Sequence, residues 1–401
     1  MNPFFKGFFF TKSVDEKRNM RIIAAPDSFK GSLTSVQAAE AIELGLKEVF
    51  PEAEVIKVPI ADGGEGTVNA IVSMTGGQLL KTQVEGPLGE KVTALFGRCK
   101  NAEGEFAVIE MAEASGLLLE KEEDRDVLRA STYGTGQLIK AALDLGIRKI
   151  VIGIGGSATN DGGAGMAQAL GAGLFDRNGQ PVARGGAALA TLERIDLSTL
   201  DKRLAETEIL IACDVKNPLC GPEGASAVYG PQKGATDEQV RILDEALRHY
   251  SDIAKRDTHR DVAENPGAGA AGGLGAGLMI FTSGRMCNGI ELVLKMIGFD
   301  DLVKSADLVF TGEGFTDSQT ANGKAPVGVA KIAKKYSIPV VCLSGGISLD
   351  ANELLNHGID AVNGTPCAPI SLADCIADAS SLLKAAAERC ARLIKIGRAL
   401  K

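Results

Sequence analysis

Five loops of this chain combine glycines with carboxylate side chains, and each follows a short apolar run typical of a strand. Residues 59–67, PIADGGEGT, and 153–163, GIGGSATNDGG, show the pattern clearly. Because ligands of open α/β sheets bind at the carboxyl ends of the strands, we expect the loops to meet at one cleft. The five segments are 25–32, 59–67, 153–163, 212–225 and 311–326.

The side chains of these loops suit magnesium-dependent phosphoryl transfer. Glycine-rich loops offer backbone N–H groups to phosphate oxygens, and carboxylates bind Mg²⁺ together with phosphate oxygens and water. Lys30 and Lys324 can neutralise phosphoryl oxygens, and an aspartate can accept the proton of a hydroxyl acceptor. Taken singly, each loop also fits tight strand-to-helix packing, and Asp27 or Asp62 fits a turn. The prediction therefore rests on the loops occurring together.

Several familiar motifs are missing or out of context. Residues 322–326, NGKAP, place Ala325 after Lys324, where a Walker loop needs serine or threonine. Residues 267–272, GAGAAG, match G-x-G-x-x-G but follow DVAENP rather than a strand, which makes dinucleotide binding a weak interpretation. The three histidines lack ligand spacing, which disfavours structural zinc and a histidine-based triad.

The order of strand-like and helix-like segments predicts an α/β protein. The chain begins with alternating strands and helices, as in a doubly wound, mainly parallel sheet of the Rossmann or flavodoxin type. Hairpin signals from about residue 78 indicate a mixed sheet, and the first pattern returns near residue 306. We predict a discontinuous doubly wound domain, an inserted α/β domain, a cleft between them that holds the active site, and an N-terminal extension outside the fold. The discontinuous domain comprises residues 20–78 plus 286–401, the inserted domain residues 79–285, and the extension residues 1–19.

Two helices carry specific signals. Thr34 and Gln37 have the spacing of a capping box and predict a helix over 34–50. The chain closes on a helix predicted from Ser371, with one apolar stripe formed by Leu372, Ile376, Leu383, Ala387 and Ile394.

Composition excludes some classes of function. The formal net charge is −8 with no basic stripe, which argues against nucleic-acid binding. No apolar run approaches the ~18 residues that a membrane span needs. The eight cysteines contain no C-x-x-C pair and favour reduced thiols, so we expect a cytoplasmic protein with small-molecule partners. A homodimer is left open.

Taken in order, the loops make the chain resemble the type-1 glycerate kinase family. The resemblance runs from Met20 to Ile396, and the N-terminal extension departs from it. It implies ATP-dependent phosphorylation of D-glycerate with Mg²⁺, 2-phosphoglycerate being favoured over 3-phosphoglycerate, and two α/β domains with one inserted in the other. It rests on APDSFKGSLTS, PIADGGEGT, GIGGSATNDGGAGMAQALG, CDVKNPLCGPEGA, GAGAAGGLG and FTGEGFTDSQTANGKAP.

Candidate roles follow for individual residues. Asp161 is the only charged side chain of residues 153–173, and its carboxylate suits a position beside the glycerate hydroxyl better than one beside ATP phosphates, which it would repel. Asp161 or Asp62 is therefore the predicted general base, and Lys30 is the third predicted catalytic residue. Predicted substrate contacts are Asp27, Ser28, Lys30, Ser157 and Asn160. Predicted ATP contacts are Gly155, Gly156, Gly312, Gly314 and Lys324, and predicted Mg²⁺ ligands are Asp214, Glu313 and Asp317.

Two other functions stay open. An NAD(P)-dependent oxidoreductase of a small hydroxy acid would need a dinucleotide loop after the first strand, but APDSFKGS supplies one glycine there. A non-catalytic protein that binds a small anion would not need so many carboxylates, because they repel the ligand unless a cation intervenes.

Overall fold

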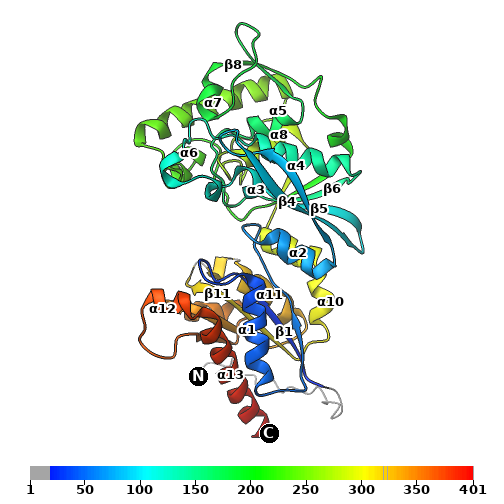
Figure 1. Cartoon of the computed structure of the whole chain (residues 1–401), viewed down its shortest axis with the longest axis vertical. Helices are drawn as coiled ribbons and strands as arrows, with labels where there is room; N and C mark the ends of the chain where they lie inside the picture. Colours follow the sequence, from blue (N-terminus) through cyan, green and yellow to red (C-terminus); the bar gives the residue numbers. More distant parts are fainter. Residues whose placement is uncertain (1–18, 319, 323, 401) are drawn as a thin grey trace, which may run out of the picture.

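The structure is a computed structural model that describes residues 19–318, 320–322 and 324–400 of the chain. The predicted extension over residues 1–19 lies outside these residues except for Asn19. Figure 1 shows two lobes stacked along the long axis, which we call the lower and the upper lobe. The lower lobe holds a five-stranded sheet and the upper lobe a six-stranded one. The predicted fold class, a doubly wound sheet joined to a second α/β unit with a mixed sheet, is confirmed.

All five strands of the lower sheet are parallel. Across the sheet they are β13 (Ala361–Gly364), β12 (Val340–Ile347), β11 (Leu308–Thr316), β1 (Arg21–Pro26) and β2 (Glu54–Lys57). Counted along the chain, this is the 2-1-3-4-5 order of flavodoxin-like sheets. The order reverses between β1 and β11, and ligands of such sheets bind at the carboxyl ends of the strands at that point.

Helices cover both faces of the lower sheet because successive side chains of a strand point to opposite sides. Ile22 and Ala24 of β1 are buried in a cluster with α1 (Ser35–Lys47) and α13 (Ala379–Ala399). Ile23 and Ala25 are buried in another cluster with α9 (Gly289–Met296), α10 (Phe299–Val303) and α11 (Ala325–Lys335). The sheet is therefore a buried layer, and its loops are left to carry the chemistry.

The upper sheet is mixed. Across it lie β10 (Arg285–Cys287), β9 (Glu208–Ala212), β6 (Lys149–Gly153), β5 (Gly104–Glu110), β4 (Lys91–Asn101) and β3 (Gln78–Glu85). The first four are parallel, whereas β4 is antiparallel to both β5 and β3. Because β10 pairs with β9, the upper sheet extends two residues past the boundary predicted at residue 285. The division of the chain into two domains itself stays a prediction.

The remaining regular elements lie mostly in the upper lobe. An antiparallel pair is formed by β7 (Gly173–Asp176) and β8 (Leu192–Asp196). The upper-lobe helices are α3 (Ala112–Ser115), α4 (Tyr133–Asp144), α5 (Ala164–Ala169), α6 (Ala225–Tyr229), α7 (Asp237–Thr258) and α8 (Leu274–Phe281).

None of the helices in the described part of the chain combines the length and the apolarity needed to cross a membrane.

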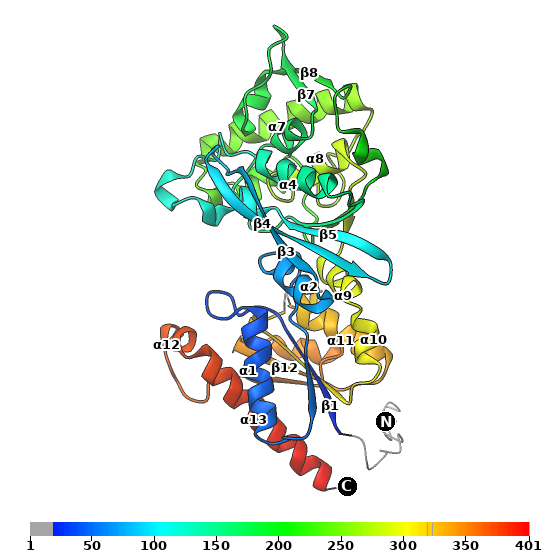
Figure 2. The ribbon, with the colours of Figure 1, turned by 45° about the vertical axis from the view of Figure 1, so that its right-hand side comes forward.

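Helices α2 (Thr67–Thr75) and α9 lie between the two sheets (Figure 2). One hydrophobic cluster joins Ile71 of α2 and Val293 of α9 to Phe106 of β5 and Val309 of β11. The two lobes are therefore connected by a shared apolar layer as well as by the chain.

The two specific helix predictions have different outcomes. The capping box of α1 is confirmed, since Gln37 N–H donates to Thr34 Oγ1 at 3.2 Å and Thr34 N–H to Gln37 Oε1 at 2.9 Å. The prediction of a single C-terminal helix was wrong, because Asp378 separates α12 (Leu372–Ala377) from α13. Leu372 is 76% exposed, whereas Leu383 of α13 is fully buried against α1. Only the α13 part of the stripe has a partner, so the apolar pattern overstated the length of one helix.

Candidate active site

Three glycine-rich loops meet at the carboxyl ends of the central lower strands. Asp27 N–H donates to Gly312 O at 2.8 Å, which joins the loop after β1 to β11. Ile60 N–H donates to the carbonyl of the last residue of β1 at 3.0 Å. A Cβ on Gly314 would lie 3.2 Å from the Lys30 backbone nitrogen, so this approach favours glycine. The three loops are 25–32, 59–67 and 311–326.

The loop over 59–67 also contacts the upper sheet. A Cβ on Gly63 would lie 2.7 Å from Ala212 Cβ at the end of β9, and a Cβ on Gly155 would lie 3.0 Å from Gly64 Cα. Gly63 has a φ of +98°, a conformation that other residues rarely adopt. The loops that begin at the ends of β6 and β9 therefore lie against the same segment, and the five loops are connected across the two lobes.

Asp27 lies at the reversal of strand order beside two other carboxylates. Burial raises the pKa of Asp27 to about 7, and the negative charges of Asp62 and Glu313 raise it as well. The Ser28 N–H, which donates to Asp27 Oδ1 at 2.6 Å, opposes this rise. The raised pKa of Asp27 therefore reflects its burial together with two neighbouring negative charges.

Asp214 brings a carboxylate from the upper sheet toward the same loop. Burial raises its pKa to about 6, and Asp62 adds to the rise. Asp214 Oδ1 accepts hydrogen bonds from Gly289 N–H at 2.8 Å and from Asn288 Nδ2 at 2.7 Å, which hold it at the start of α9. Asp62 itself is exposed and influences both Asp27 and Asp214, so it lies between the carboxylates of the two lobes.

Glu313, Asp317 and Lys324 are brought together by one threonine. Thr320 Oγ1 donates to Glu313 Oε1 at 2.7 Å, and Thr320 N–H donates to Asp317 Oδ1 at 3.1 Å. Lys324 Nζ lies 3.6 Å from Asp317 Oδ1. Burial raises the pKa of Glu313, which the hydrogen bond of Thr320 and the charge of Lys324 oppose. Two predicted metal ligands and one predicted ATP contact are therefore neighbours.

The three predicted Mg²⁺ ligands do not lie together in a single metal site. Within residues 19–318, 320–322 and 324–400, no three histidine, cysteine, aspartate or glutamate side chains form a group that could hold a metal ion. Asp214 lies with α9, apart from the Glu313–Asp317 pair. Mg²⁺ commonly takes only one or two protein carboxylates and completes its shell with phosphate oxygens and water. The Glu313–Asp317 pair fits that demand.

Replacing Asp27 with asparagine should stabilise the ligand-free protein at pH 8. The pKa of Asp27 is about 7 in the folded state and 3.8 ordinarily, so its stabilising contribution is fully present below pH 3.8 and is lost as the pH rises through 7. Asparagine resembles the protonated form at every pH. We expect a gain in Tm of roughly 2–4 °C at pH 8 that shrinks steadily toward pH 4. A Tm difference that is independent of pH would contradict the stated cause.

Of the two predicted general bases, Asp161 is buried in the structure. Its side chain is fully buried. Oδ2 accepts from the N–H groups of Thr132 at 2.8 Å and Gly165 at 3.1 Å, and Oδ1 accepts from Gly163 N–H at 3.1 Å. These bonds tie the start of α4 to the start of α5. Burial raises the pKa of Asp161, and the hydrogen bonds oppose that rise. The geometry is that of a structural anchor, with no solvent-exposed oxygen to meet a substrate.

The other predicted substrate contacts differ in exposure. Lys30 is exposed and Ser28 is half-buried in the loop after β1. Ser157 and Asn160 are buried in the loop after β6. Asn160 Nδ2 donates to Ser226 Oγ at 2.9 Å, whereas its Oδ1 is buried without a hydrogen-bond partner.

Sequence reasoning missed two buried charged residues near these loops. Glu110, the last residue of β5, accepts from Val68 N–H at 2.6 Å and Gly66 N–H at 3.2 Å, and burial raises its pKa to about 7. A carboxylate that ends the apolar run EFAVIE was a usable signal for it. Lys233 is 2% exposed, and its surroundings, GPQKGA, gave no sign of burial.

A doubly wound sheet with carboxylates at its reversal point, facing a second α/β lobe, defines a two-lobe α/β enzyme architecture. Residues 22–395 match the model of the glycerate kinase family. The chain belongs to this family and is a kinase.

Individual relatives cover nearly the whole chain. A glycerate kinase of Bacillus subtilis is 49% identical over 381 residues, which is 95% of this chain and 99% of that protein. A glycerate 2-kinase of Escherichia coli is 51% identical over 343 residues, which is 86% of this chain and 90% of that protein. A crystal structure assigned as glycerate kinase 2 from Salmonella typhimurium has a TM-score of 0.84 at 48% identity, covering 95% of this chain and all of that one.

Proposed function

We propose that this protein phosphorylates the 2-hydroxyl of D-glycerate with ATP and Mg²⁺. The observation that carries the proposal is the match of residues 22–395 to the glycerate kinase family. The printed name of the Escherichia coli relative, glycerate 2-kinase, supports the 2-hydroxyl as the acceptor. Carboxylates that gather at the reversal point of a doubly wound sheet suit a reaction that needs both a proton acceptor and a cation.

Asp62 is the proposed general base. It is exposed, lies between the carboxylates of the two lobes, and holds its loop through Gly64 N–H, which donates to Asp62 Oδ1 at 3.1 Å. Its second carboxylate oxygen can accept the proton of the glycerate hydroxyl as the phosphoryl group arrives. Asp161 is proposed to anchor the loop after β6, because neither of its oxygens reaches solvent.

The nucleotide is proposed to bind on the lower lobe. Lys324 supplies a positive charge beside Asp317. Gly312 and Gly314 let neighbouring backbone pack against the end of β11, since a Cβ there would lie 2.0 Å from Leu343 O and 3.2 Å from Lys30 N, respectively. Glu313 and Asp317 would hold Mg²⁺, which when bound neutralises phosphate charge. Gly155 and Gly156 would contact the phosphoryl group from the upper lobe, and Lys30 would stabilise it from the loop after β1.

Turnover measurements test this proposal directly. ADP release should depend on D-glycerate and Mg²⁺, and phosphorus NMR should identify 2-phosphoglycerate. D-lactate, which keeps the 2-hydroxyl and lacks the 3-hydroxyl, should be a slow acceptor, whereas 3-hydroxypropionate should not react. ADP release with 3-hydroxypropionate alone would assign the 3-hydroxyl instead.

The domain division, the oligomeric state and the cellular location are parts of the same proposal. Residues 79–285 would close on residues 20–78 plus 286–401 and exclude water from the reacting groups. Small-angle scattering with and without both substrates should show compaction if this closure occurs. Size-exclusion chromatography with light scattering tests the homodimer, and cell fractionation tests the cytoplasmic location.

A further inference from the structure

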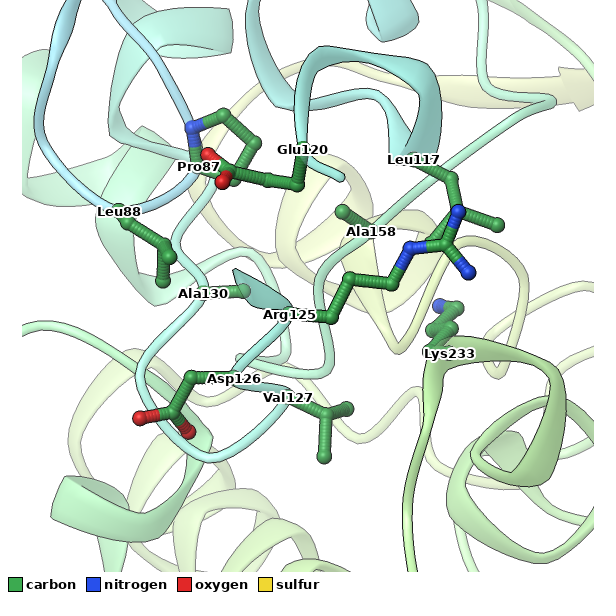
Figure 3. Close-up of a pocket in the computed structure, with 10 residues that line it drawn as sticks. All are labelled: Pro87, Leu88, Leu117, Glu120, Arg125, Asp126, Val127, Ala130, Ala158 and Lys233. Atoms are coloured by element: carbon green, nitrogen blue, oxygen red, sulfur yellow. The ribbon is translucent and has the colours of Figure 1, made fainter. Parts of the chain in front are cut away.

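A pocket in the upper lobe carries two cationic side chains that none of the preceding roles uses. It lies between the turn after β3, the segment over 117–130, the loop after β6 and Lys233. Figure 3 shows its lining. Most of the wall is apolar, and the lining residues are Pro87, Leu88, Leu117, Glu120, Arg125, Asp126, Val127, Ala130, Ala158 and Lys233.

The charged side chains of this pocket are arranged asymmetrically. The Arg125 guanidinium and the Lys233 amine point toward one another, whereas the carboxylates of Glu120 and Asp126 point away from them (Figure 3). Asp126 Oδ1 is used by its own loop, since it accepts from Leu128 N–H at 3.1 Å. The pocket therefore presents positive charge on one side without a carboxylate of its own lining to neutralise it.

Both cations have hydrogen-bonding capacity left over. Lys233 Nζ donates to Thr159 O at 2.6 Å and to Ser157 Oγ at 3.3 Å. An ammonium group has three donor protons, so one remains available for a ligand. Arg125 Nε is buried without a hydrogen-bond partner. Buried polar groups are normally paired, so an unpaired guanidinium nitrogen beside a buried ammonium indicates a site for an anion. Burial lowers the pKa of Lys233 to about 7, and the negative charge of Asp161 opposes this fall.

One short loop joins the wall of the pocket to the candidate active site. Ala158 lines the pocket, and Gly155 contacts Gly64 beside Asp62. Three residues span at most about 11 Å, and the turn at Gly156, which has a φ of +75°, shortens that distance. The wall is fixed to this loop, because Leu117 N–H donates to Gly156 O at 2.8 Å.

We propose that Arg125 and Lys233 bind the carboxylate of the hydroxy-acid substrate in this pocket. The proposal rests on the proposed function and adds the residues that recognise the acid. The nucleotide is assigned to the lower lobe. The two substrates would then be held by opposite lobes, with Asp62 between them.

Arg125→Gln tests the assignment, and Arg129→Gln is the matched control. Arg129 belongs to the same segment, and its loss removes the same charge. Its side chain is 75% exposed and lies 4.0 Å from Asp126 Oδ2, an exposed pairing that contributes little. We expect Arg125→Gln to raise KM for D-glycerate by about tenfold or more, because a charge-assisted hydrogen bond is lost, with KM for ATP within about twofold. Arg129→Gln should leave both constants unchanged. Lys233→Met should show the same pattern, measured where its circular dichroism and Tm indicate a folded protein.

Calorimetry with D-glycerate alone separates this proposal from the proposed function. Weaker glycerate binding in Arg125→Gln, with nucleotide binding intact, supports the pocket even if turnover proves slow. Unchanged glycerate affinity and KM in Arg125→Gln would overturn the pocket assignment while leaving the kinase function in place. A rise confined to KM for ATP would assign the pocket to nucleotide phosphate and overturn it as well. Absence of ADP release by the unaltered protein would refute the proposed function itself.

Discussion

Replacing Asp62 with asparagine is expected to lower kcat with D-glycerate by about 10²- to 10⁴-fold, the contribution typical of a general base. The amide cannot accept the hydroxyl proton, whereas its oxygen can still accept the Gly64 N–H bond that shapes the loop. KM for ATP should change little, because Asp62 is assigned to the acceptor side. Single-turnover measurements at saturating substrate report the chemical step directly.

Glu65→Gln is the control for this experiment. Glu65 is an exposed carboxylate three residues along the same loop, so its loss changes the local charge equally. Its kcat should stay within about twofold of the original value. An Asp62→Asn protein that turns over normally would remove Asp62 from the role of base and would return attention to Asp27, whose pKa of about 7 also suits proton transfer.

Asp161→Asn is expected to lower the free energy of unfolding and to change the rate of the chemical step much less. Both carboxylate oxygens accept backbone N–H bonds, so the NH₂ group of asparagine must face at least one N–H donor in either orientation. Loss of a charged acceptor together with an unsatisfied buried donor costs about 3 kcal/mol or more of the free energy of unfolding. Thermal and urea unfolding measure this loss, and kcat of the folded fraction should fall far less than in Asp62→Asn.

Asp176→Asn provides the comparison for Asp161. Asp176 also accepts two backbone N–H bonds, from Asn178 and Gln180, but both reach the same oxygen and the residue ends β7 just before an exposed turn. Asparagine can keep its oxygen there and turn its NH₂ to water, so the cost should be less than about 1 kcal/mol. A stable Asp161→Asn protein with a lost chemical step would contradict the anchoring role and would restore Asp161 as the base.

Much of the fold could be predicted from the sequence because the signals are local. The capping residues of α1, the apolar run of β6 and the glycines that follow it act within a few positions of the chain. The C-terminal helix shows the limit of this reasoning. Its apolar stripe includes Ile376 of α12, but only residues of α13 pack against α1.

The components of this site can be recognised in the sequence: the glycine-rich loops, their position after strands and the carboxylates that they carry. Which of these side chains meet solvent becomes visible only in the folded chain. Asp161 and Asp62 occupy similar loops in the sequence, yet Asp161 is buried between the starts of α4 and α5, whereas Asp62 is exposed. Burial depends on which distant segments pack against a loop, and local pattern does not contain that information. For the same reason, the sequence does not reveal that Lys233 is buried, because its hydrogen-bond partners lie 74 and 76 residues away in the chain.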